Sequence, residues 1–423
     1  MPKYAGQFEY ASPGAGVEQG GPCAFSFDDR TATLEPADGP PLAFDLGDID
    51  RFQPGEWDIR LSLYTGHVVT LLRFGKALRD LTRELLDAYR DRLVKCLLVG
   101  DLDEVARFSG RAVLEPGPGV PAWPAEIRLF ESNLAVLPDA APGFQWRLAD
   151  ISTVEFDEAR YAVVLSRGSE RLTIGHLAKR TGEFAESVRS RITALDERTA
   201  RTLHGLFPFL EPGQFRRVAS LLRDGACAPV AALRSVHAST EPVLMEKVVD
   251  PALRPYVDVL VRRAAGRSWY AGLKVIRRES GETGEMEVSG EERDPSVFEA
   301  GDGLEVLYWF FFPLSASGGA TTHVAWEATS RAGRATYLFR LSGGEPVEPA
   351  VSSINRGLVA LNFRREPIYL EARTLESDMR YRHYAIAQRK VPDVGRVRQA
   401  FAGRAVHATQ EAWEKQIEEG LSR

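Results

Sequence analysis

Cysteine is scarce in this chain of 423 residues, and the three cysteines lie far apart. Cys23, Cys96 and Cys227 fit neither a disulfide framework nor the paired spacing of a zinc site. The first residues contain no apolar stretch of signal-peptide length, and the longest apolar run, 306–314, is too short to span a bilayer. We therefore expect a cytoplasmic protein.

Motifs that bind nucleotides or activate nucleophiles are also missing. The chain has no GxxxxGKS/T loop, no GxGxxG after a predicted strand, no HExxH, no paired CxxC and no GxSxG. Its seven histidines are dispersed, without the spacing of metal ligands. We therefore expect no cofactor and no metal, and the sequence argues against an enzyme. A Ser–His–Asp set assembled by folding stays open.

An excess of positive charge is absent as well. The net charge is −6, which gives no overall attraction to nucleic acid or to an anionic membrane. Hydrophobic residues make up 44% and charged residues 26% of the chain, as in ordinary globular proteins, and the length favours two to four domains. Most basic residues are arginine, which is typical of GC-rich bacterial coding.

What the chain does contain is a strongly amphipathic stretch from Phe74 to Val99. Leucines recur on one side of the predicted helix, and charged residues occupy the other side. About seven short alternating segments precede it. Residues 57–64 alternate clearly, with Trp57, Ile59, Leu61 and Leu63 on one face. The apolar stripe of the helix is therefore expected to cover a β-sheet.

The same arrangement occurs a second time, at an offset of 102–104 residues. An ordered series of matches that includes loop, turn and helix rarely arises by chance. The matched positions are Tyr4–Gly6 with Phe108–Gly110, Phe25 with Ile127, Leu46 and Asp48 with Leu148 and Asp150, Leu61 and Leu63 with Val163 and Leu165, Gly66 with Gly168, and Leu85 with Val188.

Seven strands closed by one helix resembles the pleckstrin-homology-like (PH-like) fold, over residues 3–99 and 107–196. The resemblance implies two β-barrels, each closed by a C-terminal helix, that bind phosphoinositides, peptides or proteins. Lipid-binding members carry basic residues on the first two strands and the loop between them. Here that loop, 12–22 in one repeat and 115–126 in the other, has no Lys or Arg. We therefore expect protein partners and no phosphoinositide membrane.

The remaining chain completes an α+β multidomain protein. We predict PH-like repeats over 1–100 and 101–198, a helical connector over 199–265, and a C-terminal α+β domain with a mainly antiparallel sheet over 266–423. In the last domain we expect a helix over 347–363, extended segments over 364–370 and 381–388, and one helix over 393–421.

Two clusters in the last domain are candidates for a site. Aromatic residues concentrate in its strands, which is typical of a core but also of a ligand pocket. Arginines outnumber acidic residues beyond Arg356, which fits either a solvated face or a surface for anions. If the chain is extended at Arg364 and Arg365, one of them faces inward and needs a carboxylate or an anionic ligand. The candidate ligand- or partner-binding residues are Arg356, Arg364, Arg365, Tyr369, Arg380, Arg382, Trp309 and Trp326.

The repeated fold and the missing motifs favour a non-enzymatic protein-binding or scaffold protein of bacterial origin. One alternative is an enzyme, or a binder of small molecules or anions, with its site in the C-terminal domain. A second alternative is a nucleic-acid-associated factor, because tandem barrels of this class occur in chromatin proteins. The acidic balance argues against nucleic acid. The residues name neither the partner nor an oligomeric state.

Overall fold

The structure is a computed structural model that describes residues 3–115, 122–264, 266–277, 297–299, 304–315, 319–329 and 335–422. Contacts divide the chain into two compact units. Unit 1 comprises Met1–Ile192 and Ala372–Val391, and unit 2 comprises Thr193–Glu371 and Pro392–Arg423. The division at residues 100, 198 and 265 stays a prediction. Among the described residues, no helix is both long enough and apolar enough to cross a membrane.

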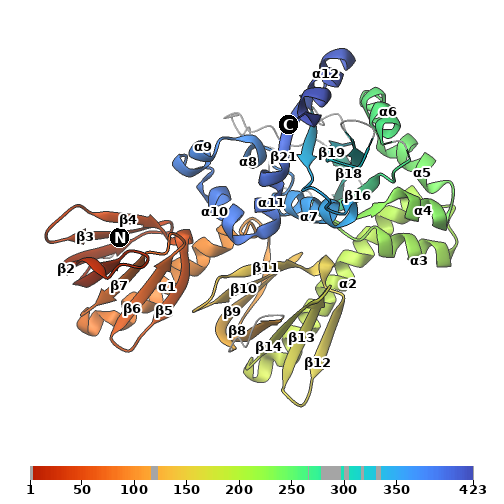
Figure 1. Cartoon of the computed structure of the whole chain (residues 1–423). Coiled ribbons are helices and arrows are strands. Elements are labelled where there is room, and N and C mark those ends of the chain that lie inside the picture. Colours follow the sequence, from red (N-terminus) through yellow and green to blue (C-terminus); the bar gives the residue numbers. More distant parts are fainter. Residues whose placement is uncertain are drawn as a thin grey trace. The chain divides into compact units, whose positions relative to one another are not determined.

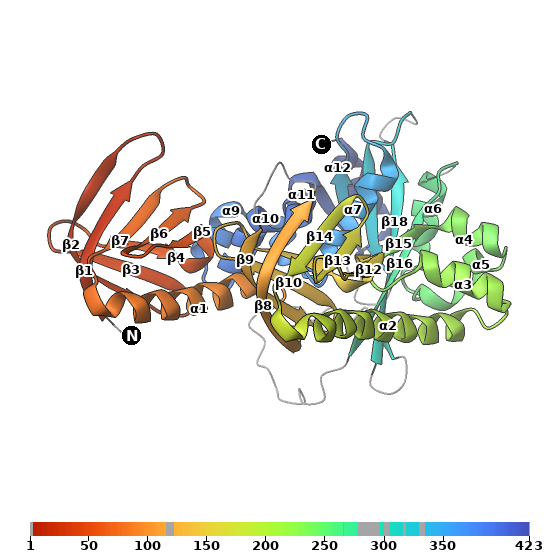
Figure 2. The same cartoon turned by 90° about the horizontal axis from the view of Figure 1, so that it is seen from below.

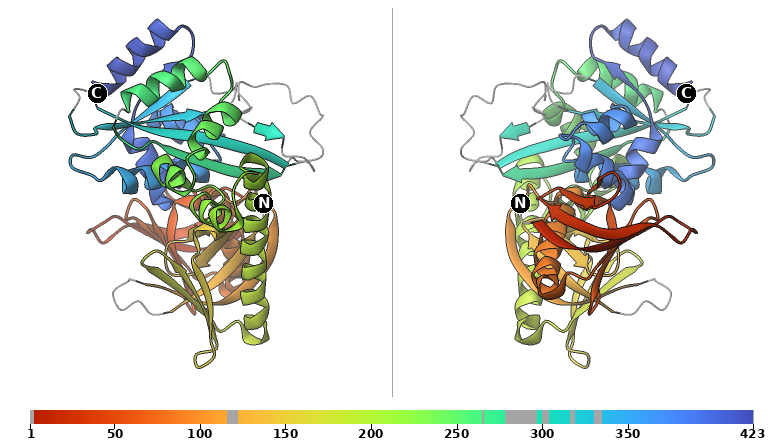
Figure 3. Two further views of the ribbon diagram at one scale, coloured as in Figure 1. Left: turned by 90° about the vertical axis from the view of Figure 1, so that its right-hand side faces the viewer. Right: turned by 90° about the vertical axis from the view of Figure 1, so that its left-hand side faces the viewer.

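Unit 1 opens with a seven-stranded antiparallel sheet, in the order β4-β3-β2-β1-β7-β6-β5 (Figure 1). Alternating residues such as Phe25, Phe27, Ile59 and Leu61 are buried, so one face of the pleat forms a core. The strong curl of these strands is visible in red and orange in Figure 3. The strands are β1 (Lys3–Ala11), β2 (Val17–Phe27), β3 (Thr31–Pro36), β4 (Leu42–Asp45), β5 (Ile49–Pro54), β6 (Asp58–Leu63) and β7 (Val68–Leu72), and the short helix η1 (Leu46–Asp48) precedes β5.

The amphipathic stretch after this sheet is helical, as predicted. A short turn, η2 (Gly75–Ala77), leads into α1 (Leu78–Cys96), which runs beside the first sheet in Figure 2. Leu81, Leu85 and Leu93 are fully buried, and the ring of Tyr89 stacks on Phe52 with 5.8 Å between centroids. The leucine stripe of α1 therefore forms the core together with the sheet.

A second seven-stranded antiparallel sheet follows, and its order, β11-β10-β9-β8-β14-β13-β12, repeats that of the first. The loop match near Pro116 lies outside the described residues. The elements are β8 (Glu104–Glu115), β9 (Trp123–Phe130), β10 (Asn133–Pro138), β11 (Phe144–Arg147), η3 (Leu148–Asp150), β12 (Thr153–Asp157), β13 (Ala162–Arg167), β14 (Glu170–Gly175), η4 (Ala178–Arg180) and α2 (Thr181–Leu206).

Matching glycines reveal a packing constraint that both repeats share. A Cβ atom on Gly6 would lie 2.7 Å from the ring of Phe74, which precedes the first helix. On Gly110 it would lie 2.7 Å from Leu177, the residue before η4, and 2.6 Å from the carbonyl oxygen of Gly175. In both repeats an apolar side chain at the start of the helical segment therefore packs directly on a glycine of the first strand.

Two details of the expected first repeat are wrong. Trp57 was expected within a strand, on the same face as Ile59 and Leu61, but it precedes β6 in the hairpin turn and is 76% exposed. Leu61 was matched with Val163, but strand pairing shows a different register. Ile59 pairs with Leu71 as Val163 pairs with Ile174, so the counterpart of Leu61 is Leu165. A shift of two residues keeps the same face inward, so periodicity could not detect the error.

The sheet of unit 2 is also antiparallel and follows the order β15-β16-β18-β19-β20-β21, with β17 paired to β18. Helices cover both faces. Phe310 belongs to a core cluster with residues of α6 and α12, whereas Trp309 on the opposite face donates a hydrogen bond to Asn355 of α7 at 2.9 Å. The strands are β15 (Cys227–Pro229), β16 (Tyr270–Arg277), β17 (Val297–Glu299), β18 (Leu304–Leu314), β19 (His323–Ala328), β20 (Ala335–Arg340) and β21 (Phe401–Val406).

Several short helices surround this sheet, and the expected helix over 347–363 is confirmed as α7 (Val347–Ala360). The other helices are α3 (Pro212–Leu221), α4 (Val230–Val236), α5 (Thr240–Val243), η5 (Leu244–Val248), α6 (Arg254–Arg263), α8 (Glu366–Tyr369), α11 (Pro392–Ala400) and α12 (Gln410–Leu421), while α9 (Ala372–Ser377) and α10 (Arg382–Lys390) belong to unit 1.

Three expectations for the C-terminal chain are wrong. Residues 364–370 are not extended, because Pro367 in the first turn supports the helix α8. Residues 381–388 form most of α10. The helix predicted over 393–421 is interrupted by β21, which pairs with β20 along one side of the sheet. A helical apolar period continues through these six residues, but pairing with β20 supplies their backbone hydrogen bonds.

Candidate functional site

Three aspartates meet where β4 turns through η1 into β5, and we call Asp45, Asp48 and Asp50 the acidic corner. The carboxylate of Asp45 accepts a hydrogen bond from the backbone N–H of Gly47 at 2.7 Å, which caps the short helix. This tight turn brings Asp48 to a buried position, where its side chain is 7% exposed. The local sequence therefore places carboxylates in and around a buried turn.

Helix α10 contributes the positive charges that neutralise this corner. Arg382 donates to one carboxylate oxygen of Asp48 at 2.6 Å, and Arg389 donates to the other. Lys390 donates to Asp50 at 3.0 Å and to the carbonyl oxygen of Ile49 at 2.9 Å. One helix thus contacts the turn through three cations, in charge-assisted hydrogen bonds.

Close packing and an arginine–aromatic contact also link α10 to the region of the acidic corner. A Cβ atom on Gly47 would lie 2.9 Å from Ile386 and 2.7 Å from the sulfur of Cys96, so a larger residue here would have to displace these side chains. The guanidinium of Arg389 also lies 3.7 Å from the ring centroid of Tyr64. Side chains from α10 are therefore complementary to the turn in both charge and shape.

Burial and the neighbouring positive charges shift the pKa of Asp48 in opposite directions. Removal from water raises the pKa of its carboxyl, and the two arginines of α10 lower it only in part, so the pKa stays above its ordinary value. Lys390 is buried even more fully, with 4% of its side chain exposed. The contact with α10 is therefore specific in geometry, but the burial of charge costs part of its favourable energy.

A cavity of about 410 Å³ opens beside the acidic corner. In its wall, Arg92 of α1 makes a bidentate pair with Asp45, with nitrogen–oxygen distances of 2.8 and 2.6 Å. Phe44 and Met379 add apolar surface, and Met379 is 67% exposed. The cavity has the mixture of apolar surface and a few fixed polar groups that suits a side chain or a small ligand.

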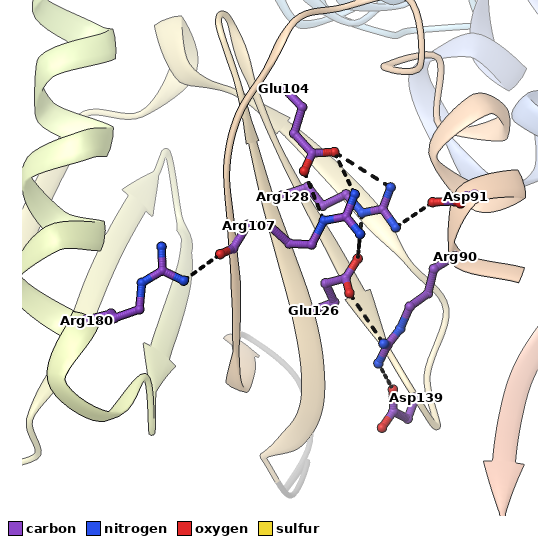
Figure 4. A network of polar contacts seen from close by, with 8 residues as sticks. All are labelled: Arg90, Asp91, Glu104, Arg107, Glu126, Arg128, Asp139 and Arg180. Carbon is purple, nitrogen blue, oxygen red and sulfur yellow. Dashed lines mark hydrogen bonds and ion pairs between the residues drawn. The ribbon is translucent and has the colours of Figure 1, made fainter. Parts of the chain in front are cut away.

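A second charged cluster joins the two repeats of unit 1, and Figure 4 shows its bonds. Arg90 of α1 lies 3.4 Å from Glu126 of β9 and 2.6 Å from Asp139. Arg128, of which 5% is exposed, lies 2.6 Å from Glu126 and 2.8 Å from Asp91 of α1. The network is almost dry around Glu126 and Arg128, so it fixes the first closing helix against the second sheet.

The same hairpin in each repeat carries exposed aromatic side chains. Trp57 lies in the β5–β6 turn. In the equivalent β12–β13 hairpin, Phe156 and Tyr161 contact each other edge to face at 5.6 Å, and they are 36% and 53% exposed. Large exposed aromatic groups are enriched at protein interfaces, so these tips are candidate contact points.

Six of the eight residues expected to form a site lie in unit 2. Trp326 is fully buried, and Arg365 lies 5.8 Å from its ring centroid. Trp309 is a core residue bonded to Asn355. Arg356 pairs with Asp393 at 2.8 Å, and Arg404 lies over the ring of Tyr369 at 4.5 Å. Arg364 is exposed.

Arg380 and Arg382 instead lie in the segment that belongs to unit 1. Arg380 pairs with its neighbour Asp378 at 2.8 Å, while Arg382 binds Asp48. The structure therefore divides the eight residues between two units, and it brings Arg365 and Trp326 together in an arginine–aromatic contact. Their role in binding stays a prediction.

Sequence reasoning missed Asp48 as a candidate site residue, although it recognised the match of Asp48 with Asp150. The available signal was weak: three aspartates in six residues around a Gly47–Asp48 turn. The basic partners of Asp48 and Asp50 lie more than 330 residues away in the chain, and no local pattern reports such pairs.

Comparisons with known proteins give little further information. No family model and no curated protein matches the chain. Among the solved structures that match is one described as "Crystal Structure of an N-terminally Truncated Linker-DH/PH Domains of p115-RhoGEF", at 9% identity and a TM-score of 0.20. The match covers 29% of this chain and 46% of that one, less than two thirds of either. A similarity this low carries no argument about fold or function.

Proposed function

We propose that the chain is a non-enzymatic protein-binding scaffold built on two tandem PH-like repeats. The support for PH-like repeats is the identical order of the two seven-stranded sheets, each followed by a short 3-10 turn and an amphipathic helix. The support for protein binding is a single observation. The equivalent hairpin of each repeat presents exposed aromatic side chains, Trp57 in one and the Phe156–Tyr161 pair in the other.

The support for a scaffold role is the set of ion pairs that links the first repeat to the second. Two separate modules on a flexible linker would pay for ordering at each binding event. Here the ion network around Glu126 and Arg128 joins α1 to the second sheet, and both hairpins belong to unit 1. Linking two contact points in one unit raises affinity for a partner that engages both.

Partner capture by the full chain from its native host tests this proposal. Wild type should recover at least one protein reproducibly, and both Trp57→Ala and Tyr161→Ala should lose it, because a truncated aromatic anchor commonly costs more than about 2 kcal/mol of binding. Val17→Ala is the matched control, since Val17 is 58% exposed but lies on β2.

Thermal unfolding of each variant separates a loss of binding from a loss of stability. All three side chains are exposed, so we expect the unfolding temperatures to match that of wild type. If both aromatic variants retain every partner of the wild-type chain, the hairpins are not the binding surface and the proposal loses its main support.

A further inference from the structure

We infer that the acidic corner is a binding site for a basic amphipathic helix of a partner protein, and that α10 is an intramolecular occupant of that site. This inference goes beyond the hairpin surface and does not depend on it. It rests on the contacts of α10 with Asp48, Asp50, Gly47 and Tyr64, all within unit 1.

The occupant itself defines the chemistry of the partner. Arg382, Ile386, Arg389 and Lys390 stand at relative positions 0, 4, 7 and 8, which places them on one face of a helix. The cations meet aspartates, and the isoleucine meets the glycine of the turn. A partner helix with the same pattern satisfies the same groups. An acidic corner repels nucleic acid and anionic lipid, so a protein helix is the occupant that charge favours.

Several features make α10 an exchangeable occupant. It is a helix of nine residues with no side-chain cap at its N-terminus, and it forms no strand pairing with the sheet. Arg382 and Arg389 keep 22% and 27% of their side chains exposed, so water can compete for their bonds. The buried amide nitrogen of Gln388 has no acceptor among the described residues. Release of α10 breaks these side-chain bonds and uncovers the buried Ile386, but it removes no strand pairing from the two sheets of unit 1.

Covalent attachment gives α10 an advantage over any free helix. A tethered segment acts at an effective concentration in the millimolar range, so a free copy of the same helix competes poorly with it. Weakening the attached helix should consequently expose the site. This predicts that a peptide of residues 378–392 binds an opened chain much better than it binds wild type.

Fluorescence anisotropy with that labelled peptide provides the test. In the full chain, Arg382→Ala with Arg389→Ala removes both partners of Asp48 and opens the site; we expect at least tenfold tighter peptide binding than to wild type. Adding Asp48→Asn to the opened chain should weaken binding at least tenfold. Asp150→Asn, at the matched position of the second repeat, is the control and should change nothing. A peptide with Arg389→Glu and Lys390→Glu should not bind.

A second measurement covers the case in which the double variant unfolds. Hydrogen exchange of wild type is followed with and without excess peptide, and displacement of α10 should speed exchange of the amides of residues 384–390 in the chain. The inference is overturned if the folded, opened chain binds the peptide no better than wild type, or if Asp48→Asn has no effect. It is also overturned if saturating peptide leaves the exchange of α10 unchanged.

Discussion

The two repeats of unit 1 share one strand order but neutralise the same carboxylate in different ways. Asp48 in the first repeat binds two arginines of α10, which lies more than 330 residues further along the chain. Asp150, its counterpart, lies 3.4 Å from Arg147 of its own turn. The turn of the second repeat thus supplies a cation for its own aspartate, whereas that of the first depends on a distant helix.

The residues just before these aspartates account for the difference. Asp45 stands where the second repeat has Arg147, and Arg92 of α1, which binds Asp45, stands where α2 has the buried Leu195. At this position of the turn the charge is therefore of opposite sign in the two repeats. On the sheets, by contrast, the second repeat carries the charged residues. Its Glu126 and Arg128 stand where the first repeat has Ala24 and Ser26. The two repeats therefore share their core packing, but their charged residues differ and make different contacts.

The largest effect should come from this charged difference on the sheets. Glu126→Ala removes the carboxylate that Arg128 and Arg90 share, while Asp91 and Asp139 remain as their partners. Breaking a buried pair outright costs about 3–5 kcal/mol, so we expect the low end of that range, about 3 kcal/mol. Urea unfolding of unit 1 measures the loss. Glu104→Ala, whose carboxylate is 31% exposed, is the control and should cost much less. A loss below about 1 kcal/mol for Glu126→Ala would show that the network does not hold the repeats together.

Matched core positions on the two closing helices come next. Leu85 and Val188 are both fully buried. Leu85→Ala should cost about 2–5 kcal/mol through lost burial and a cavity. Val188→Ala should cost less, because valine loses fewer carbon atoms. Guanidinium unfolding curves of both variants test this order, and an inconsequential Leu85→Ala would contradict the packing of α1 on its sheet.

A matched backbone position should respond in opposite directions. Gly75 and Ala178 begin the short turns before α1 and α2, with φ of 57° and 52°. The left-handed region disfavours a Cβ by about 1–2 kcal/mol. Gly75→Ala should therefore lower the free energy of unfolding by about 1 kcal/mol, while Ala178→Gly should raise it slightly or leave it unchanged. Thermal unfolding separates the two, and equal losses in both variants would refute the shared backbone geometry.

The smallest effect concerns pH. Burial raises the pKa of Asp48 above its ordinary value of 3.8, so the folded state disfavours the charged form. The contribution of this titration to stability is fully present below pH 3.8 and is lost as pH rises through the raised pKa. Unfolding free energies of wild type and Asp48→Asn between pH 3 and 7 should therefore differ in slope, with wild type losing relative stability as pH rises. Parallel curves would contradict the burial of a charged Asp48.

Much of the fold was accessible from the sequence because it depends on local periodicity. The stripe of leucines around Leu85 predicted α1, and the alternation through Ile59 and Leu61 predicted β6. Errors occurred where local pattern and tertiary pairing disagree. Trp57 continues an alternating run but lies in a turn, and residues 401–406 continue a helical period but pair with β20. Strand pairing with a distant segment outweighed intrinsic preference there.

Local patterns therefore specify which segments are amphipathic, where the second repeat begins, and which glycines and leucines recur in it. The folded chain alone reveals that Arg382 and Arg389 contact Asp48, that Arg90 contacts Glu126, and that residues 372–391 belong to unit 1. The physical reason is the range of each interaction. Hydrophobic periodicity is a local property of a few turns of a helix or a few residues of a strand. The partner of a buried charge, by contrast, can come from any part of the chain that folding brings within hydrogen-bond distance.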